Sequence, residues 1–331
     1  MTRRGGPQPL RVLWLLALLG LPARAAAAPP GPQVKELRVV LLSTMLADRG
    51  RGEWGFSALV EADGHRVLFD TGAAPDTVLH NARALGVDLG GVEDVVLSHN
   101  HGDHTGGLLA LRRALRGAHP RALSRAHVAT GIFYPRPAGS SSATDGNPLT
   151  RERAAYEASG GRFVVHAAPA ALQPGLWLTG PVPRVFPERN YGALGRVQTP
   201  TGLVADVVPE DQALVIDTAR GLVVLTGCGH AGIVNTLDLA QRQRGGAPVY
   251  AVLGGLHLYQ ASDEALRWTG GELRARGVQH LLGAHCTGIE AVFALRRELG
   301  LTRATCVVGA VGASFRLDCG PAVIDPLRLA R

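Results

Sequence analysis

Short blocks of apolar residues, separated by glycine, aspartate and proline, recur along most of the chain and predict β-strands. We expect strands at 36–44, 56–62, 66–70, 93–97, 162–166, 176–178, 212–217, 222–226, 249–253 and 280–282. Asp63-Gly64 is a strong turn signal, so the second and third of these strands form a hairpin. The strands at 212–217 and 222–226 form a second hairpin.

After several of these strands, apolar residues recur at the spacing of a helix. We expect helices at 108–115, 151–158, 233–242, 263–276 and 289–299, and one more that Pro75 opens and Gly86 ends. Hairpin-rich strands join helices in both halves of the chain, which fits two sheets packed together with helices outside. No Ser/Gly/Pro-rich linker interrupts the pattern, so we expect one domain at 33–331.

Three segments predict loops. Residues 45–54 are rich in arginine and glycine, and we expect them to form a loop near the opening of a functional site. Residues 139–147 are small and polar, which predicts a mobile loop. Residues 184–191 combine aromatic and arginine side chains, which suits either a substrate mouth or a solvated loop. His119, His127 and His166 have no partner spacing, so we expect surface or loop histidines there.

The N-terminus has the pattern of a secretory signal peptide, which we place at 1–28. Arg3, Arg4 and Arg11 precede an apolar run at 12–21, and the alanines at 23–28 offer cleavage sites. The pattern favours the general export pathway over a twin-arginine route, and a periplasmic or secreted protein. The apolar run is too short for a stable membrane span after cleavage, although an uncleaved anchor is the alternative.

The charge balance excludes one class of partner. The formal net charge is +7, and removing residues 1–28 takes away four arginines and no acids, which leaves +3. Lys35 is the single lysine, and no Lys/Arg-rich run occurs. We therefore expect a small-molecule substrate and no nucleic acid, with the oligomeric state left open.

The densest chemistry lies at 98–107, where His99, His101, Asp103 and His104 fall within six positions of a strand-to-helix turn. An extended chain after Leu97 places the first three on one side and His104 on another, so one site could hold two ions. Imidazole and carboxylate ligands suit zinc first, with manganese or iron as substitutes. The helix dipole should keep His104 neutral. A solvated polar turn is the alternative.

The HxHxDH motif resembles the metallo-β-lactamase superfamily. Further matches lie at Asp70-Thr71-Gly72 and at 226–235, 254–258 and 283–288, and together they resemble the branch of the archaeal dihydropterin aminobenzene-phosphate synthase and many bacterial hydrolases. The resemblance implies an αββα sandwich of two mixed β-sheets with outer helices. It also implies that Asp70 supports the metal ligands by hydrogen bonding, whereas an ordinary turn or cap carboxylate is the alternative.

Later histidines should complete the ligand set, because four residues in one turn cannot surround two ions. His230 and His285 each follow a strand among small residues, and we assign both as ligands. His257 competes for the last position, and we place it behind the ligands or in the substrate pocket. Most dinuclear members of the superfamily have a bridging aspartate where this chain has Gly227-Cys228. Either Cys228 or Asp211 replaces it, or the second ion binds weakly.

The remaining cysteines allow a different hypothesis. Cys306 and Cys319 flank a predicted terminal hairpin, so they could form a disulfide in an oxidising compartment.

The ligand pattern predicts a metal-dependent hydrolase. A metal-bound hydroxide would attack a small ester, phosphoester or lactone-like substrate, and Asp103 would orient this nucleophile or accept its proton. Cleavage of β-lactams is not favoured, since the later motifs resemble the synthase branch. A pterin-synthase-like transferase and a non-catalytic metal- or ligand-binding module are the alternatives. The substrate and the number of ions remain open.

Overall fold

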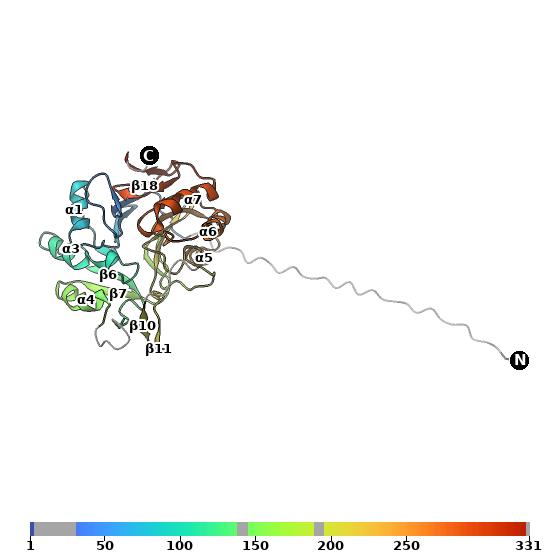
Figure 1. Ribbon diagram of the computed structural model, residues 1–331, viewed down its shortest axis with the longest axis horizontal. Coiled ribbons are helices and arrows are strands. Elements are labelled where there is room, and N and C mark those ends of the chain that lie inside the picture. Colours follow the sequence, from blue (N-terminus) through green and yellow to red (C-terminus); the bar gives the residue numbers. More distant parts are fainter. Residues whose placement is uncertain (3–30, 138–144, 189–194, 329–331) are drawn as a thin grey trace.

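The computed structural model describes residues 1–2, 31–137, 145–188 and 195–328. Nearly all of the predicted signal peptide and most of the predicted loop at 139–147 lie outside the described residues. Two large sheets face each other, and helices cover the outer face of each (Figure 1). Among the described residues, no helix combines the length and the apolar character needed to cross a bilayer.

The first sheet has eight strands in the order β19-β18-β1-β3-β4-β5-β6-β7. Their bounds are β1 (Leu37–Ser43), β3 (Ser57–Ala62), β4 (His65–Phe69), β5 (Asp94–Val96), β6 (Arg125–Ala129), β7 (Arg162–His166), β18 (Ser314–Leu317) and β19 (Val323–Asp325). The pairs from β19 to β4 are antiparallel, and those from β4 to β7 are parallel. This sheet is therefore mixed.

The second sheet has seven strands in the order β16-β15-β14-β13-β12-β9-β8. Their bounds are β8 (Ala170–Gln173), β9 (Leu176–Leu178), β12 (Ala213–Thr218), β13 (Gly221–Thr226), β14 (Val249–Gly254), β15 (His280–Gly283) and β16 (Cys306–Val308). Antiparallel pairs run from β8 to β13, and parallel pairs from β13 to β16. Two small ladders pair β2 (Leu46–Ala47) with β17 (Ala310–Val311) and β10 (Arg196–Thr199) with β11 (Gly202–Ala205).

Helices complete the two outer layers. The first sheet carries α1 (Thr77–Ala84), α3 (Leu108–Leu115) and α4 (Pro148–Ala158), and the second carries α5 (Ile233–Gln243), α6 (Asp263–Ala275) and α7 (Ile289–Leu299) (Figure 1). The short α2 (Gly102–Thr105) and the 3-10 turn η1 (His285–Thr287) follow strand ends. The Ser262 hydroxyl accepts the Ala265 N–H and so caps α6. The predicted αββα sandwich is confirmed.

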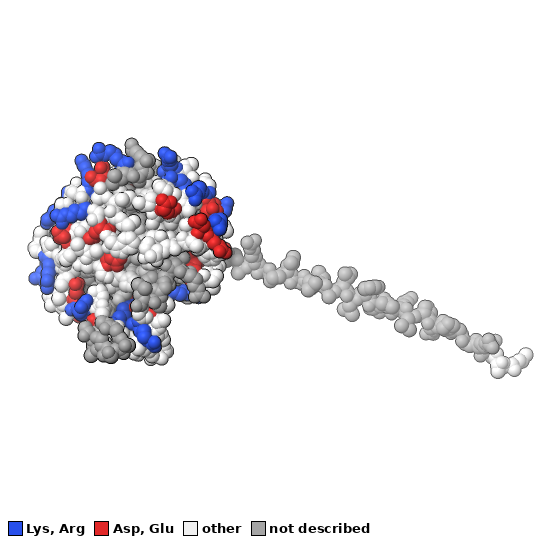
Figure 2. Space-filling view, in the orientation of Figure 1, with Lys and Arg blue, Asp and Glu red and all other residues white. Residues whose placement is uncertain are grey.

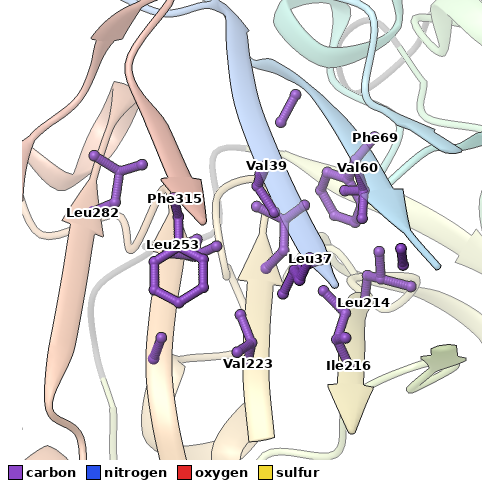
Figure 3. Packing of buried hydrophobic residues seen from close by; sticks show 14 of the residues in the cluster. Leu37, Val39, Val60, Phe69, Leu214, Ile216, Val223, Leu253, Leu282 and Phe315 are labelled. Atoms are coloured by element: carbon purple, nitrogen blue, oxygen red, sulfur yellow. The ribbon is translucent and has the colours of Figure 1, made fainter. Parts of the chain in front are cut away.

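The main core lies between the two sheets. Leu37, Val39 and Phe315 of the first sheet face Ile216 and Leu253 of the second (Figure 3). Each is at most 3% exposed, and burial of one such side chain stabilises the fold by about 1.5–3 kcal/mol. Two further apolar clusters lie under the outer helices. These three clusters hold the strand ends of the two sheets in fixed positions.

Most predicted elements are present within a few residues of their expected bounds, but β2, β6, β8, β10, β11 and β19 were not predicted. The expectation for His127 was wrong, since it is 7% exposed on β6. Its Nε2 lies 2.9 Å from Asp94 Oδ1, and its Nδ1 lies 3.1 Å from His166 Nε2. His166 is half-buried on β7, whereas His119 is exposed as expected. Polar partners from other strands therefore accommodate this histidine inside the sheet.

The proposed Cys306–Cys319 disulfide is wrong. Both cysteines are free thiols, Cys306 buried and Cys319 exposed. The predicted hairpin between them does not form, because β16 belongs to the second sheet while β18 belongs to the first. The Cys306 Sγ instead lies 3.6 Å from the Val292 carbonyl.

Candidate metal centre

The predicted site residues follow the carboxyl ends of parallel strands. Asp70 and His99 lie beyond β4 and β5, which are parallel neighbours in the first sheet. His230, His257 and His285 lie beyond β13, β14 and β15, which are parallel in the second sheet. Parallel strands end at the same edge, so each sheet gathers its residues at one place. The two edges meet, because His99 and His230 belong to one cluster.

The extended segment after β5 ends at His101, because α2 begins at Gly102. This corrects one expectation: Asp103 does not share a side with His99 and His101, but is turned toward His104 and His285. Gly106 lets the loop at Ala73 pack closely against the end of α2, since a Cβ there would lie 2.0 Å from the Ala73 carbonyl oxygen.

The first group of candidate ligands consists of His99, His101 and His230. Their ring centroids are 4.6–4.8 Å apart, and one ligand atom from each lies within 4.8 Å of the others. The Ser98 Oγ lies 2.8 Å from His99 Nδ1, and His99 Nε2 is buried without a hydrogen-bond partner among the described residues. Burial and neighbouring imidazoles lower the pKa of His99 well below its ordinary value. A neutral ring with an open nitrogen suits a cation.

Burial also sets the charge of the other two histidines. It lowers the pKa of His101 to about 4, against an opposing effect of Asp103. It lowers the pKa of His230 well below the ordinary value, with further contributions from His101 and His257. All three rings are therefore neutral at pH 7 and present lone pairs rather than positive charge.

The second group consists of Asp103, His104 and His285. The Asp103 Oδ2 lies 3.3 Å from His285 Nε2 and 3.8 Å from His104 Nε2. Burial opposes the charge of Asp103, but the two histidines outweigh it and lower its pKa below the ordinary value. Thr44 Oγ1 accepts the N–H of His285 at 3.0 Å and fixes the start of η1. The Asp103 side chain is 22% exposed, whereas both histidines are buried.

Asp70 makes hydrogen bonds to Ser98 and to the candidate ligand His104. Its Oδ1 accepts the Ser98 N–H at 2.7 Å, and its Oδ2 accepts the Ser98 hydroxyl at 2.8 Å and lies 2.7 Å from His104 Nδ1. Its backbone has φ +56°, and it is fully buried. It belongs to none of the ligand groups of the described residues. This arrangement agrees with the supporting role that the resemblance implied.

The expectation that the helix dipole keeps His104 neutral was wrong for the metal-free chain. Burial alone would lower the pKa of His104, but the carboxylates of Asp70 and Asp103 raise it to about 9. The α2 helix has only four residues, so its dipole is small beside two carboxylates.

Cys228 and Asp211 differ clearly in position. The Cys228 Sγ lies 3.1 Å from His104 Nε2 and 3.2 Å from the Cys286 Sγ. Cys228 groups with His99 and His104, and also with His257 and Cys286. Asp211 belongs to none of the groups of the described residues.

The buried Asp211 carboxylate instead supports the turn that carries His230. Its Oδ2 accepts the Ala231 N–H at 2.7 Å, and burial raises its pKa to about 7. Arg184 contacts the same turn, since its guanidinium donates to the His230 carbonyl at 3.0 Å. The segment that starts at Arg184 therefore packs against the centre at its described end, and residues 189–191 lie outside the described residues.

Sequence reasoning missed two contributors. Ser98 links Asp70 to His99, and its place directly before the motif was the available signal. Cys286 lies in the motif at 283–288 but was assigned no role, and its contact with Cys228 depends on two strands far apart in sequence. Buried neutral imidazoles, a carboxylate and thiols together match the donors that zinc prefers, so the residues fit a bound cation.

Comparison with known proteins agrees with this geometry. A family model described as the metallo-beta-lactamase superfamily matches residues 53–234, which is more than half of the chain. This chain belongs to the metallo-beta-lactamase superfamily. Members of the superfamily usually bind metal ions, and this one has groups of His, Cys and Asp that could hold them.

Individual relatives within the superfamily differ in activity. A 7,8-dihydropterin-6-methyl-4-(beta-D-ribofuranosyl)-aminobenzene-5'-phosphate synthase of Methanocaldococcus jannaschii is 29% identical over 270 residues, covering 78% of this chain and 90% of that protein. The crystal structure of Tm1679, a metal-dependent hydrolase of the beta-lactamase superfamily, is 29% identical with a TM-score of 0.64, covering 84% of this chain and 98% of that one. Zinc-bound PqqB from Methylobacterium extorquens is 15% identical with a TM-score of 0.51, covering 84% and 99%, and it shares the fold.

Proposed function

We propose that this superfamily member is an exported, metal-dependent hydrolase of a small ester, phosphoester or lactone-like substrate. The observation that supports this most is the pair of ligand groups around His99 and His104, with the carboxylate of Asp103 partly exposed beside them. The similarity to a solved metal-dependent hydrolase at 29% identity supports the same reading.

The donors divide into two positions. His99, His101 and His230 would hold one cation, and Asp103, His104 and His285 would hold a second one with help from Cys228. Zinc suits these donors first, and manganese or iron are the realistic substitutes. When bound, such a cation makes water nucleophilic at neutral pH and polarises the substrate oxygen.

The side chains of the centre would position the attacking water and orient the histidine ligands. Asp103 is the partly exposed carboxylate of the centre, so it would orient the attacking water and accept a hydrogen bond from it. Asp70 holds the ring of His104 through Nδ1, which leaves Nε2 directed at the centre. The Ser98 hydroxyl holds His99 in the same way. Water adds to the acyl or phosphoryl atom, the bond to the leaving oxygen breaks, and that oxygen takes up a proton.

Two other functions compete with hydrolysis. The curated relative at 29% identity is a synthase, which favours a carbon–nitrogen bond-forming transferase as the second candidate. The exported location that we propose argues against it, because phosphorylated pterin precursors are cytoplasmic. A non-catalytic metal-binding module is the third candidate, but storage does not need a water-orienting carboxylate such as Asp103.

The proposed location and partners rest on the sequence. The pattern at 1–28 supports cleavage and a periplasmic or secreted protein. Acidic and basic side chains are interspersed on the face in Figure 2, which supports a small-molecule substrate rather than nucleic acid. Cell fractionation with N-terminal sequencing tests the location: an uncut chain in the cytoplasm would promote the transferase.

The test of hydrolysis uses the mature protein loaded with Zn²⁺ or Mn²⁺ and a panel of esters, phosphoesters and lactones. We expect turnover that His101→Ala and chelation each abolish. His65→Ala is the matched control, because His65 is exposed on β4 outside the centre. Turnover that survives both the substitution and chelation would exclude the mechanism. Tight metal binding without turnover on any substrate would favour the binding module.

A further inference from the structure

Two large aromatic side chains are exposed beside the centre. Trp54 is 47% exposed and Tyr259 is 45% exposed. Their rings meet edge to face with centroids 5.5 Å apart. They come from positions about two hundred residues apart in the sequence, one before β3 and one after β14. Large aromatic side chains that are exposed next to each other mark a candidate binding surface.

The pair lies beside the metal centre. The Trp54 ring lies 4.9 Å from the ring of His285, and the Tyr259 ring lies 5.4 Å from that of His257. His257 and Asp103 are partly exposed, whereas His285 is buried. Because His285 also contacts Asp103, the two aromatic rings adjoin the partly exposed part of the centre.

The backbone around Trp54 is fixed by the loops of the centre. The Glu53 carboxylate accepts the N–H groups of Ala73 and Ala74, each at 3.0 Å, and the Ser43 hydroxyl at 2.7 Å. Phe56 donates its N–H to the Asp103 carbonyl at 3.0 Å. Trp54 therefore sits between two anchored residues.

Tyr259 is fixed in a comparable way. Its N–H donates to the Cys286 carbonyl at 3.2 Å, within the turn that carries His285. Gly288 packs directly against it, since a Cβ at that position would lie 2.8 Å from the Tyr259 Cα. Both aromatic residues are thus held by the segments that supply candidate ligands, so a ligand need not order them on binding.

We propose that Trp54 and Tyr259 form an aromatic platform, and that the substrate carries a flat, unsaturated ring next to the bond that is cleaved. This inference rests on the proposed function, which concerns the bond that is hydrolysed. The platform concerns the ring next to that bond. Stacking favours a flat ring over a puckered ring of similar size, because only the flat ring presents a π-face to the aromatic side chains. One such contact corresponds to an affinity difference of roughly three- to ten-fold.

The first experiment measures binding without chemistry. The Zn²⁺-loaded protein is titrated calorimetrically with benzylphosphonate and with cyclohexylmethylphosphonate, which share one metal-binding group and differ in ring shape. We expect the benzyl compound to bind roughly three- to ten-fold more tightly. Trp54→Ala and Tyr259→Ala should each reduce this preference, and Trp54→Phe should keep part of it. Trp268→Ala is the matched control, because Trp268 lies on α6 and is 36% exposed. The described residues show no ring contact between Trp268 and either member of the pair.

The second experiment measures turnover of benzyl acetate and cyclohexylmethyl acetate, whose scissile bonds are alike. Trp54→Ala should raise KM for the benzyl ester about three- to ten-fold with little change in kcat, and leave the cyclohexyl ester nearly unaffected. Equal affinity of the wild-type protein for the two phosphonates, or a preference that Trp54→Ala leaves intact, would overturn the platform. If neither ester is cleaved but Trp54→Ala removes the phosphonate preference, hydrolysis of these esters is excluded, while the aromatic platform is supported.

Discussion

The Sγ of Cys228 lies 3.1 Å from Nε2 of His104, in a pair that is buried in the centre. Most dinuclear members of the superfamily place a bridging aspartate at the corresponding strand end. Asp211, the other candidate for this role, faces the turn at Ala231 instead. The position of the thiol therefore supports Cys228 as the group that contacts a second cation.

Cobalt substitution tests this role of Cys228. A thiolate ligand gives Co²⁺ an intense near-ultraviolet charge-transfer absorption, whereas imidazole and carboxylate ligands do not. We expect this absorption in the cobalt-loaded protein and its loss in Cys228→Ala. Cys228→Asp should lose the absorption but retain the second equivalent of cobalt, because it restores a carboxylate. Cys319→Ser is the control, since that thiol is exposed. Absorption that Cys228→Ala leaves unchanged would show that this sulfur is not a ligand.

Asp70 should govern metal affinity without contacting the metal. Its carboxylate lies 2.7 Å from His104 Nδ1 and also holds Ser98. Removal of such a supporting partner typically weakens metal binding by about 10- to 100-fold. We expect this loss for Asp70→Asn in a competition titration with a chromophoric chelator. Asp76→Asn serves as the control because its side chain is 70% exposed. Wild-type affinity in Asp70→Asn would contradict the supporting role.

The sequence predicted the helices that have a long periodic apolar pattern and the strands that end at a clear turn signal. The hairpin at Asp63-Gly64 and the helices α5, α6 and α7 lie close to their expected bounds. Strand β6 was missed because Arg125 and His127 interrupt its apolar run. These side chains are accommodated by Asp94, with Arg125 Nε at 2.6 Å and His127 Nε2 at 2.9 Å, and that partner is distant in sequence.

The structure brings together the residues that the sequence assigned as ligands, but it divides them differently from the expectation. The six residues assigned as ligands all lie in the two groups at the sheet edges. Their division between the groups differed, because it depends on where α2 begins. That helix starts directly after His101, whose backbone is still extended. The contact of Cys228 with Cys286 depends on the alignment of β13, β14 and β15, which a sequence pattern does not specify.

Thiol counting tests the correction to the disulfide. Cys306 is buried, and burial raises its pKa to about 11, so it should react slowly in the native protein. Cys319 is exposed and should be the rapidly reacting thiol. We expect four thiols after denaturation of the exported protein that has not been exposed to reductant. Cys319→Ser should lower the denatured count by one. A denatured count that does not fall in Cys319→Ser would mean that Cys319 was already paired.

The buried Asp94 should make stability depend on pH in the acid range. Burial would raise the pKa of its carboxyl, but hydrogen bonds and charge from His127 and Arg125 outweigh that effect and lower it to about 2. Because the folded pKa lies below the unfolded value near 3.8, Asp94 stabilises the fold above about pH 4, and the contribution is lost as the pH falls toward 2. It amounts to about 2 kcal/mol at pH 7 and falls to roughly half of that at pH 3. Urea unfolding of metal-free wild-type protein and Asp94→Asn at pH 7, 5 and 3 should show a difference that shrinks over the last interval, with Asp76→Asn as the exposed control. A difference that stays constant down to pH 3 would mean that the charge of Asp94 is not what stabilises β5 and β6.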